Sequence, residues 1–497
     1  MWSSHPLPKS AALALAGAVV LLMATVGGSS TSAGAGETTR PRPAGPSAAF
    51  SDLSGGNGVF LGDPIPVDLQ RAGYVEHEYV GSGTATSYTG STPLAEDGRW
   101  SFAPDGTAPY RTRVLVRRPS DRARFSGTVV LEWLNVSGGV DADPEWSTTH
   151  EEILRRGDAW VGVSAQRIGV EGGPVLVRVD VPGSEAAGVG LKAIDPARYG
   201  SLEQPGDGFS FDIYTQVARA VRSGAGMAGA RPKRVIAAGE SQSAFALVTY
   251  YNGVQPLTKA FDGFFVHSRG GRWLPLVGPG ESAGIAGAIG GTPTIFRTDQ
   301  GTPVLDVQTE SDITSVLNSY AARQPDSDRF RLWEVAGTAH ADAHLLGSTA
   351  QYIQCAVPIN NGPLHVVAKA GLRAVKTWVE TGKAPPKAPR IDVASGASPQ
   401  IQRNADGIAQ GGIRTPPVDV PVAALSGAPG PNPSTICLLL GSTNPISPER
   451  LAQLYPSRAA YKQRYDGATD AAIKAGFVLP ADRAALVAFA DPSAIQG

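Results

Sequence analysis

One short stretch of the chain, from Arg234 to Tyr250, constrains the fold more than any other. An apolar run ends at Gly239, Ser241 follows, and apolar residues then resume at helical spacing, so the stretch predicts a strand, a sharp turn and a helix. A serine on such a turn is held at an unfavourable backbone angle and needs small neighbours, here Gly239 and Ser243. This G-x-S-x-S pattern differs by one residue from the G-x-S-x-G nucleophile elbow. The turn also places the backbone N–H of Gln242 at the start of a helix, where it can face a developing oxyanion.

Two later strand ends supply the partners that a nucleophilic serine needs. Residues 303–312 predict a strand that runs into a polar turn with two carboxylates, of which Asp312 is the expected acid and Glu310 its competitor. His340 lies in the loop after the last predicted strand. A serine hydroxyl is a poor nucleophile, so a histidine must accept its proton and a carboxylate must orient the imidazole. We therefore expect Ser241, His340 and Asp312 to act together.

The histidine loop also fits a second interpretation. The spacing of His340, Asp342 and His344, each two positions from the next, resembles that of the ligands in hydrolytic zinc or iron sites. A metal-dependent hydrolase is therefore an alternative. Such an enzyme normally needs further His or Asp clusters, whereas the chain has 7 His and no second His cluster at ligand spacing. We expect no metal site, with Asp342 and His344 shaping the loop.

A Gly-bearing loop follows the apolar run Thr128 to Leu134, which is too short for a helix and typical of a strand buried on both faces. This loop, Asn135 to Gly139, is where a second oxyanion N–H is expected, from Asn135 or Val136. The alternative is an ordinary Gly-rich turn.

Two charged residues are candidates for substrate contact. Glu240 directly precedes the candidate nucleophile, and Arg269 lies just past the end of a predicted strand, Ala260 to His267. Arg269 can pair with an acidic group on a substrate or, alternatively, form an ion pair within the protein.

Strand and helix signals alternate through most of the chain. Residues 151–156 predict the end of a helix and residues 159–164 another buried strand, so βαβ units and a parallel sheet are expected. Residues 166–210 are irregular and rich in Gly, Val and Pro, and we expect them to form a cap beside the site. Earlier segments predict antiparallel edge strands: Tyr74 to Val80, Thr84 to Tyr88 and Tyr110 to Val116.

The N-terminus predicts export. Lys9 precedes an apolar block, Ala11 to Val26, and Ala33-Gly-Ala35 then resembles a cleavage site, so residues 1–35 are expected to be a signal peptide. A membrane anchor is the alternative. Residues 36–57 predict a flexible leader. A secreted protein, extracellular or in the cell envelope, with no stable membrane insertion after cleavage, is expected.

The two cysteines, Cys355 and Cys437, are expected to form a disulfide in an oxidising compartment, with two buried thiols as the alternative. Closing this loop contributes on the order of 4 kcal/mol in the chain-entropy model. The bond would staple the C-terminal extension, residues 391–497, to the main body. That extension either covers the site or closes the edge of the sheet.

Charge and glycine patterns exclude some functions. The chain has 43 Lys and Arg against 44 Asp and Glu, a net charge of −1, so no nucleic-acid partner is expected. The Gly/Ala-rich residues 278–291 contain no G-x-G-x-x-G, so nucleotide binding is not indicated.

These motifs together resemble a branch of secreted bacterial α/β hydrolases: a G-E-S-x-S elbow, an E-x-D acid turn, a G-x-x-H-A-D histidine loop and a G-G-I-R-T-P segment at residues 411–416. The resemblance implies one α/β-hydrolase domain, residues 58–497, with a mostly parallel sheet, helices on both faces, an inserted cap and an extended C-terminus. It also implies an esterase-like enzyme without a cofactor. We expect hydrolysis of small or polymeric carboxylic esters through an acyl-enzyme. An amidase or peptidase of the same fold and a non-catalytic binding protein are the alternatives.

Overall fold

The computed structural model describes residues 44–496 except for short gaps at residues 63–64, 180, 285, 287–288, 290, 395 and 397–398. Residues 42–497 form one compact unit. The predicted signal peptide, residues 1–35, lies outside the described residues.

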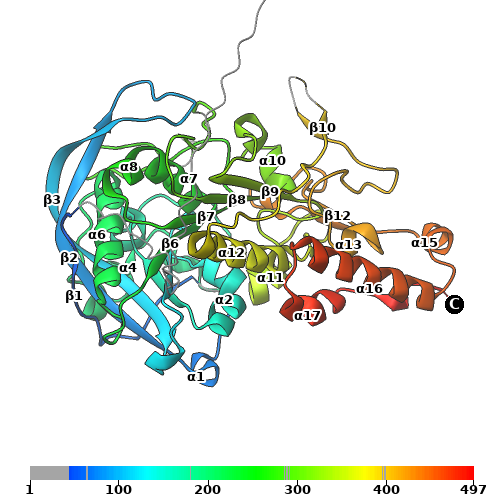
Figure 1. Ribbon diagram of the computed structural model, residues 1–497, viewed down its shortest axis with the longest axis horizontal. Coiled ribbons are helices and arrows are strands. Elements are labelled where there is room, and N and C mark those ends of the chain that lie inside the picture. The colour runs from blue at the N-terminus through cyan, green and yellow to red at the C-terminus, as the bar shows by residue number, and fades with distance from the viewer. Residues whose placement is uncertain are drawn as a thin grey trace, which may run out of the picture. The chain divides into compact units, whose positions relative to one another are not determined.

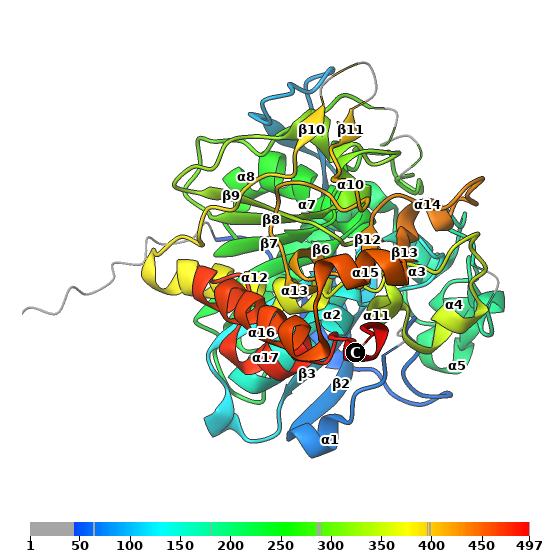
Figure 2. The same ribbon diagram turned by 90° about the vertical axis from the view of Figure 1, so that its right-hand side faces the viewer.

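A nine-stranded sheet is the centre of the described part of the chain (Figure 1 and Figure 2). Its strands lie in the order β1-β2-β3-β5-β4-β6-β7-β8-β9. The first four of these pair antiparallel, and all pairs from β5 onward are parallel. The prediction of a mostly parallel sheet is therefore confirmed. The strands span Ala49–Asp52 (β1), Tyr74–Gly90 (β2), Phe102–Pro119 (β3), Thr128–Trp133 (β4), Ala159–Val163 (β5), Arg234–Glu240 (β6), Gly263–His267 (β7), Val304–Thr309 (β8) and Phe330–Val335 (β9).

Helices cover both faces of this sheet. α6 (Ser210–Ser223) and α7 (Gln242–Thr249) contribute to the core on one face, and α2 (Pro144–Arg156) and α12 (Leu364–Thr381) to the core on the other. The longer helices of the C-terminal part are α15 (Pro448–Leu454) and α16 (Arg458–Ala475), which share a separate cluster. The short ones are α1 (Leu69–Ala72), α3 (Arg167–Glu171), α4 (Leu191–Ile194), α5 (Pro196–Tyr199), α8 (Gln255–Thr258), α10 (Glu310–Ile313), α11 (Ala343–Leu346), α13 (Pro416–Asp419), α14 (Cys437–Leu440) and α17 (Arg483–Val487). Two small antiparallel two-stranded sheets complete the described C-terminal part: β10 (Val393–Ala394) with β11 (Gln400–Ile401), and β12 (Ala423–Ser426) with β13 (Ser442–Pro445).

The side chains of the central strand β4 contribute to two hydrophobic cores, one on each face of the sheet. All of its residues are buried, and successive side chains of a strand point to opposite faces. Val129 and Leu131 pack in the core that includes residues of α6 and α7. Val130 packs in the core that includes residues of α2 and α12. An uninterrupted apolar run is therefore what this position in the sheet requires.

The antiparallel edge differs from its prediction in two details. The segments 74–80 and 84–88 are one strand, β2, which pairs along its length with β3. β1 falls within residues 36–57, so the prediction of a flexible leader up to residue 57 is wrong for this part. Phe50 of β1 packs against Tyr79 of β2, with ring centroids 5.5 Å apart, and the backbones pair. The Gly- and Pro-rich surroundings conceal so short a strand.

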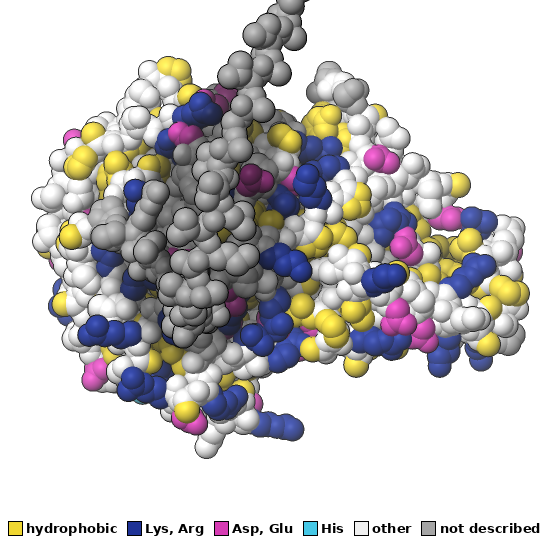
Figure 3. Space-filling model, viewed as in Figure 1, with side chains coloured by type: hydrophobic (Ala, Val, Ile, Leu, Met, Phe, Trp, Pro, Cys, Tyr) yellow, Lys and Arg dark blue, Asp and Glu magenta, His cyan; other side chains and the backbone are white. Residues whose placement is uncertain are grey.

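The surface carries charges of both signs. Figure 3 shows one face, on which Lys and Arg side chains are scattered with Asp and Glu among them. That no nucleic acid binds stays a prediction. Across the described residues, no helix has the length and apolar character that crossing a membrane requires.

Candidate active site

Ser241 lies on the tight turn between β6 and α7, with backbone angles φ 56° and ψ −121°. A positive φ is strained for a residue other than glycine, and such strain collects at functional sites. Gly239 is needed nearby, because a Cβ there would lie 3.1 Å from the Leu247 side chain and 3.2 Å from Ser243. The Ser243 hydroxyl donates to the Glu240 carbonyl oxygen at 2.7 Å and ties the helix start to the strand end. The structure thus contains the strand, turn and helix that the sequence predicts.

The side chains of Ser241, His340 and Asp312 form one hydrogen-bonded chain. His340 Nε2 lies 2.7 Å from Ser241 Oγ, and His340 Nδ1 lies 2.6 Å from Asp312 Oδ1. The other oxygen of Asp312 accepts from the backbone N–H and the hydroxyl of Thr309, both at 2.7 Å. The backbone N–H of His340 donates to the Ser311 hydroxyl at 2.7 Å. The three side chains meet because each follows the carboxyl end of a parallel strand, at one edge of the sheet.

Opposite charges and hydrogen bonds together shift the pKa values of Asp312 and His340 more than burial does. Burial alone would raise the pKa of the Asp312 carboxyl, but His340 and the hydrogen bonds from Thr309 lower that pKa. Burial alone would lower the pKa of the His340 imidazole, but Glu240 and Asp312 raise it. An ionised Asp312 favours the tautomer with its proton on Nδ1, which leaves Nε2 free to accept a proton from Ser241.

Glu240 contacts the same imidazole from another direction. Its Oε1 lies 3.3 Å from His340 Nε2, and its side chain lines the cavity described below. Burial raises the pKa of the Glu240 carboxyl to about 7, with Glu145 and Asp312 adding to the rise and His340 and His267 opposing it. The sequence predicts substrate contact for Glu240 but not its contact with the imidazole, because spacing along the chain does not tell where a buried side chain points.

The residues predicted to form an oxyanion hole differ in what their N–H groups contact. Gln242 is the first residue of α7, where an N–H has no acceptor within the helix. The Val136 N–H donates to the Gln242 side-chain oxygen over 3.3 Å. The Asn135 N–H donates to the Ala142 carbonyl at 2.9 Å, because the loop folds back into an isolated bridge. The prediction of Asn135 as a backbone donor is therefore wrong. Its side chain donates to the Glu240 carbonyl at 3.0 Å instead.

Arg269 is enclosed by the protein. Its Nε lies 2.9 Å from Asp306 Oδ2, its Nη1 donates to the Thr294 carbonyl at 2.9 Å, and its side chain is 2% exposed. The predicted substrate contact is therefore wrong, and the alternative of an internal ion pair is correct.

Glu310, the competing acid, faces away from the imidazole. It accepts from the N–H groups of Gly337 at 2.6 Å and Gly427 at 3.0 Å, and it pairs with Arg403 at 2.6 Å. These contacts anchor the C-terminal extension to the turn after β8, and they leave Asp312 as the acid that meets His340.

The three residues of the metal alternative have separate partners. Both ring nitrogens of His340 are engaged as described above. Asp342 Oδ1 accepts from the Leu345 N–H at 2.9 Å and caps α11, and the His344 ring stacks on His365 with centroids 3.7 Å apart. Among the described residues, no group of three or more His, Cys, Asp or Glu is arranged to hold a metal ion.

A cavity of about 480 Å³ opens beside Ser241 and His340. Six described residues of the segment expected to form a cap line it: Val177, Val179, Val181, Gly183, Ser184 and Ala187. The described lining residues are mainly apolar and come from distant parts of the chain: Phe60, Leu61, Gly62, Asn135, Ser137, Gly138, Val140, Ala142, Pro144, Ser147, Val177, Val179, Val181, Gly183, Ser184, Ala187, Ala341, Leu345, Leu346, Thr349, Ile436 and Leu439, beside Glu240, Ser241 and His340.

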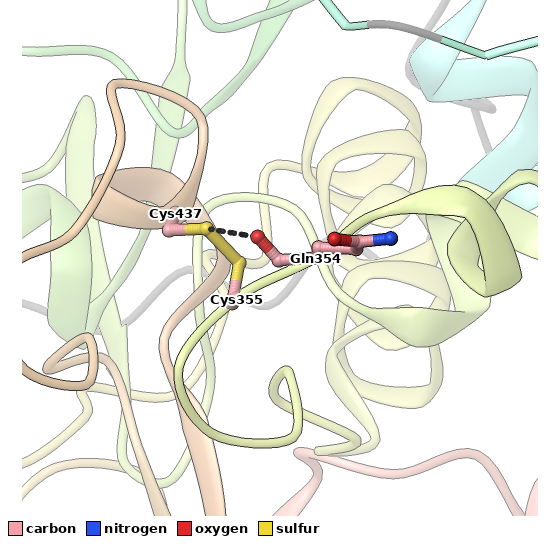
Figure 4. Close-up of a disulfide and its surroundings, with 3 residues drawn as sticks. All are labelled: Gln354, Cys355 and Cys437. Carbon is pink, nitrogen blue, oxygen red and sulfur yellow. Dashed lines mark hydrogen bonds between the residues drawn. A yellow bond between two sulfur atoms is a disulfide. The ribbon is translucent and has the colours of Figure 1, made fainter.

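A disulfide joins Cys355 to Cys437, 82 residues later in the chain, as predicted, so the alternative of two thiols is wrong (Figure 4). The Cys437 sulfur lies 3.6 Å from the Gln354 carbonyl oxygen. The C-terminal extension does both of the things considered for it. Ile413 forms a bridge with β9 at the edge of the sheet, and Ile436 and Leu439 line the cavity.

The sequence matches the model of a family described as an alpha/beta hydrolase domain over residues 38–488. One similar solved structure is an α/β serine hydrolase without a lid from Xanthomonas campestris, with 13% identity, a TM-score of 0.24 and coverage of 51% of this chain and 83% of that one. Another is the esterase rPPE, with 12% identity, a TM-score of 0.32 and coverage of 63% and 86%. A third is a cold-adapted esterase from an Arctic intertidal metagenomic library, with 12% identity, a TM-score of 0.24 and coverage of 52% and 84%. No curated protein matches the sequence.

Proposed function

The chain belongs to the alpha/beta hydrolase domain family, and from this premise we propose that it is a secreted serine hydrolase that cleaves carboxylic esters through an acyl-enzyme. The observation that carries the proposal is the hydrogen-bonded chain from Asp312 through His340 to Ser241, which ends at an apolar cavity. A strained serine, an imidazole whose Nε2 can accept the proton of that serine, and a buried carboxylate form the arrangement that activates a hydroxyl for attack on an acyl carbon.

The reaction then follows from these contacts. Ser241 Oγ attacks the ester carbonyl carbon while His340 Nε2 takes the hydroxyl proton, and Asp312 stabilises the imidazolium. The imidazolium returns the proton to the leaving alcohol as the acyl-enzyme forms. Water, deprotonated by the same imidazole, attacks the acyl carbon and releases the acid and free Ser241.

The oxyanion of each tetrahedral intermediate needs two N–H donors. We assign one to Gln242 at the start of α7, and the second to Val136, whose long bond to the Gln242 side chain exchanges for a bond to the oxyanion. Each donor lowers the barrier by roughly 3 kcal/mol.

The proposed organisation of the chain follows from the same reasoning. Residues 1–35 are a signal peptide, a leader connects them to one hydrolase domain with a cap at 166–210, and residues 391–497 are its extension. A disulfide is typical of proteins that fold in an oxidising compartment, which supports export.

Turnover of p-nitrophenyl acetate tests the proposal, with Ser241→Ala as the matched variant. We expect hydrolysis by the native protein and a loss of at least about 1,000-fold in the variant. Faster turnover of the matching anilide would identify an amidase or peptidase instead. Normal folding without turnover of either substrate would favour a non-catalytic binding protein.

A further inference from the structure

We infer that the cavity binds a neutral ester with an extended hydrocarbon chain, and that Ile436 and Leu439, which the Cys355–Cys437 disulfide fastens in place, form the wall that selects this chain over a short one. The inference rests on the proposed function, since it concerns the substrate of Ser241.

The chemistry of the cavity indicates an uncharged ligand. Among the lining residues that the structure describes, Glu240 and His340 are the only ionisable ones, and they face each other at 3.3 Å. Neither is free to pair with a charged group far from the reacting bond. A volume of about 480 Å³ is also much more than an acetyl group fills, and it lies within the range of about 300–1,000 Å³ typical of small-molecule sites.

The disulfide lies between two parts of the apolar wall. Leu345, Leu346 and Thr349 precede Cys355 in the chain, and Ile436 and Leu439 flank Cys437, so the bond fastens one part to the other. α14 has only four residues, too few to be stable by itself, so its position depends on its attachments.

Few other attachments of α14 reach the site. The Ala341 N–H donates to the Leu439 carbonyl over 3.3 Å, and the Asn360 N–H donates to the Leu440 carbonyl at 2.9 Å. The first of these bonds connects α14 to the residue after His340. The disulfide therefore supplies the covalent attachment of the wall, and these two hydrogen bonds set its position beside the substrate space.

A series of p-nitrophenyl esters tests the inference. Each buried methylene raises kcat/KM about fourfold, so the hexanoate, with four more methylenes, is expected to exceed the acetate by about 250-fold. The monoester of adipic acid, which has the length of the hexanoate and a terminal carboxylate, is expected to be at least about tenfold poorer than the hexanoate. A comparison of hexyl acetate with ethyl acetate tells whether the chain is instead on the alcohol side.

Two variants of α14 test the wall. Leu439→Ala removes a lining side chain, and we expect it to lower the hexanoate-to-acetate ratio of kcat/KM about tenfold. Leu438→Ala, in the same helix but outside the described lining, should leave the ratio unchanged. Acetate turnover also reports that each variant has folded.

The results of these experiments distinguish a failure of the inference from a failure of the proposed function. No turnover of any ester, together with no adduct from a fluorophosphonate probe, contradicts the proposed function. Acetate turnover with no gain from longer acyl or alcohol chains, or equal effects of the two leucine variants, overturns the inference alone.

Discussion

Replacement of Asp312 by Asn is the sharpest single test of how the site is organised. Asp312 is fully buried, and its two oxygens accept one hydrogen bond from His340 and two from Thr309. If the amide oxygen of the introduced asparagine keeps the bonds from Thr309, its NH₂ group faces His340 Nδ1. The imidazole must then carry its proton on Nε2, where it cannot accept the proton of Ser241.

The expected loss follows from this tautomer change. An equivalent change in a well-studied serine protease lowers kcat about 10,000-fold, so we expect kcat to fall about 1,000- to 10,000-fold, or about 4–5.5 kcal/mol of barrier. KM should change little, because Asp312 is not among the described residues that line the cavity. Steady-state kinetics on p-nitrophenyl acetate measures both quantities.

Glu310→Gln is the matched control, because Glu310 is also fully buried and lies two residues away, but it contacts Gly337, Gly427 and Arg403 instead of His340. At temperatures below the melting temperature of this variant, we expect its kcat/KM to stay within about tenfold of the native value. The proposed tautomer change is contradicted if a folded Asp312→Asn protein keeps more than about a tenth of the native kcat. A greater loss of activity in Glu310→Gln than in Asp312→Asn also contradicts it.

Three further predictions concern charge, the disulfide and metals. Glu240→Gln removes a carboxylate that raises the pKa of His340, so the acid limb of kcat/KM against pH should move to lower pH, whereas a limb that stays or moves upward contradicts this electrostatic role. Replacing both Cys355 and Cys437 by Ser should lower the free energy of unfolding by about 4 kcal/mol in urea titrations, since a loop of 82 residues is released, and a loss below about 1 kcal/mol would contradict that constraint. Prolonged treatment with EDTA should leave ester turnover unchanged, and a loss that zinc restores would favour the metal alternative.

The sequence predicts most of the site because its key residues follow strands. A turn is predicted by the small residues Gly239, Ser241 and Ser243. Asp312 and His340 each come soon after a strong apolar run. Parallel strands bring their carboxyl ends to one edge, so local patterns suffice to predict which side chains meet there.

What the sequence misses depends on packing between segments far apart in the chain. Glu240 reaches the imidazole of His340 because both are buried at the same place, which no spacing records. The backbone N–H of Asn135 donates to the Ala142 carbonyl because the loop folds back locally, and the Gly-rich sequence of the loop does not reveal this. Leu439 lines the cavity because the C-terminal extension folds back onto the main body, where a disulfide and hydrogen bonds to α14 hold it.

Mass spectrometry of the protein after reaction with a fluorophosphonate probe tests the central claim most directly. We expect one adduct per chain, mapped to Ser241, absent in Ser241→Ala and formed far more slowly in His340→Ala. A folded protein that gains no adduct, or one whose adduct persists undiminished in Ser241→Ala, would contradict it.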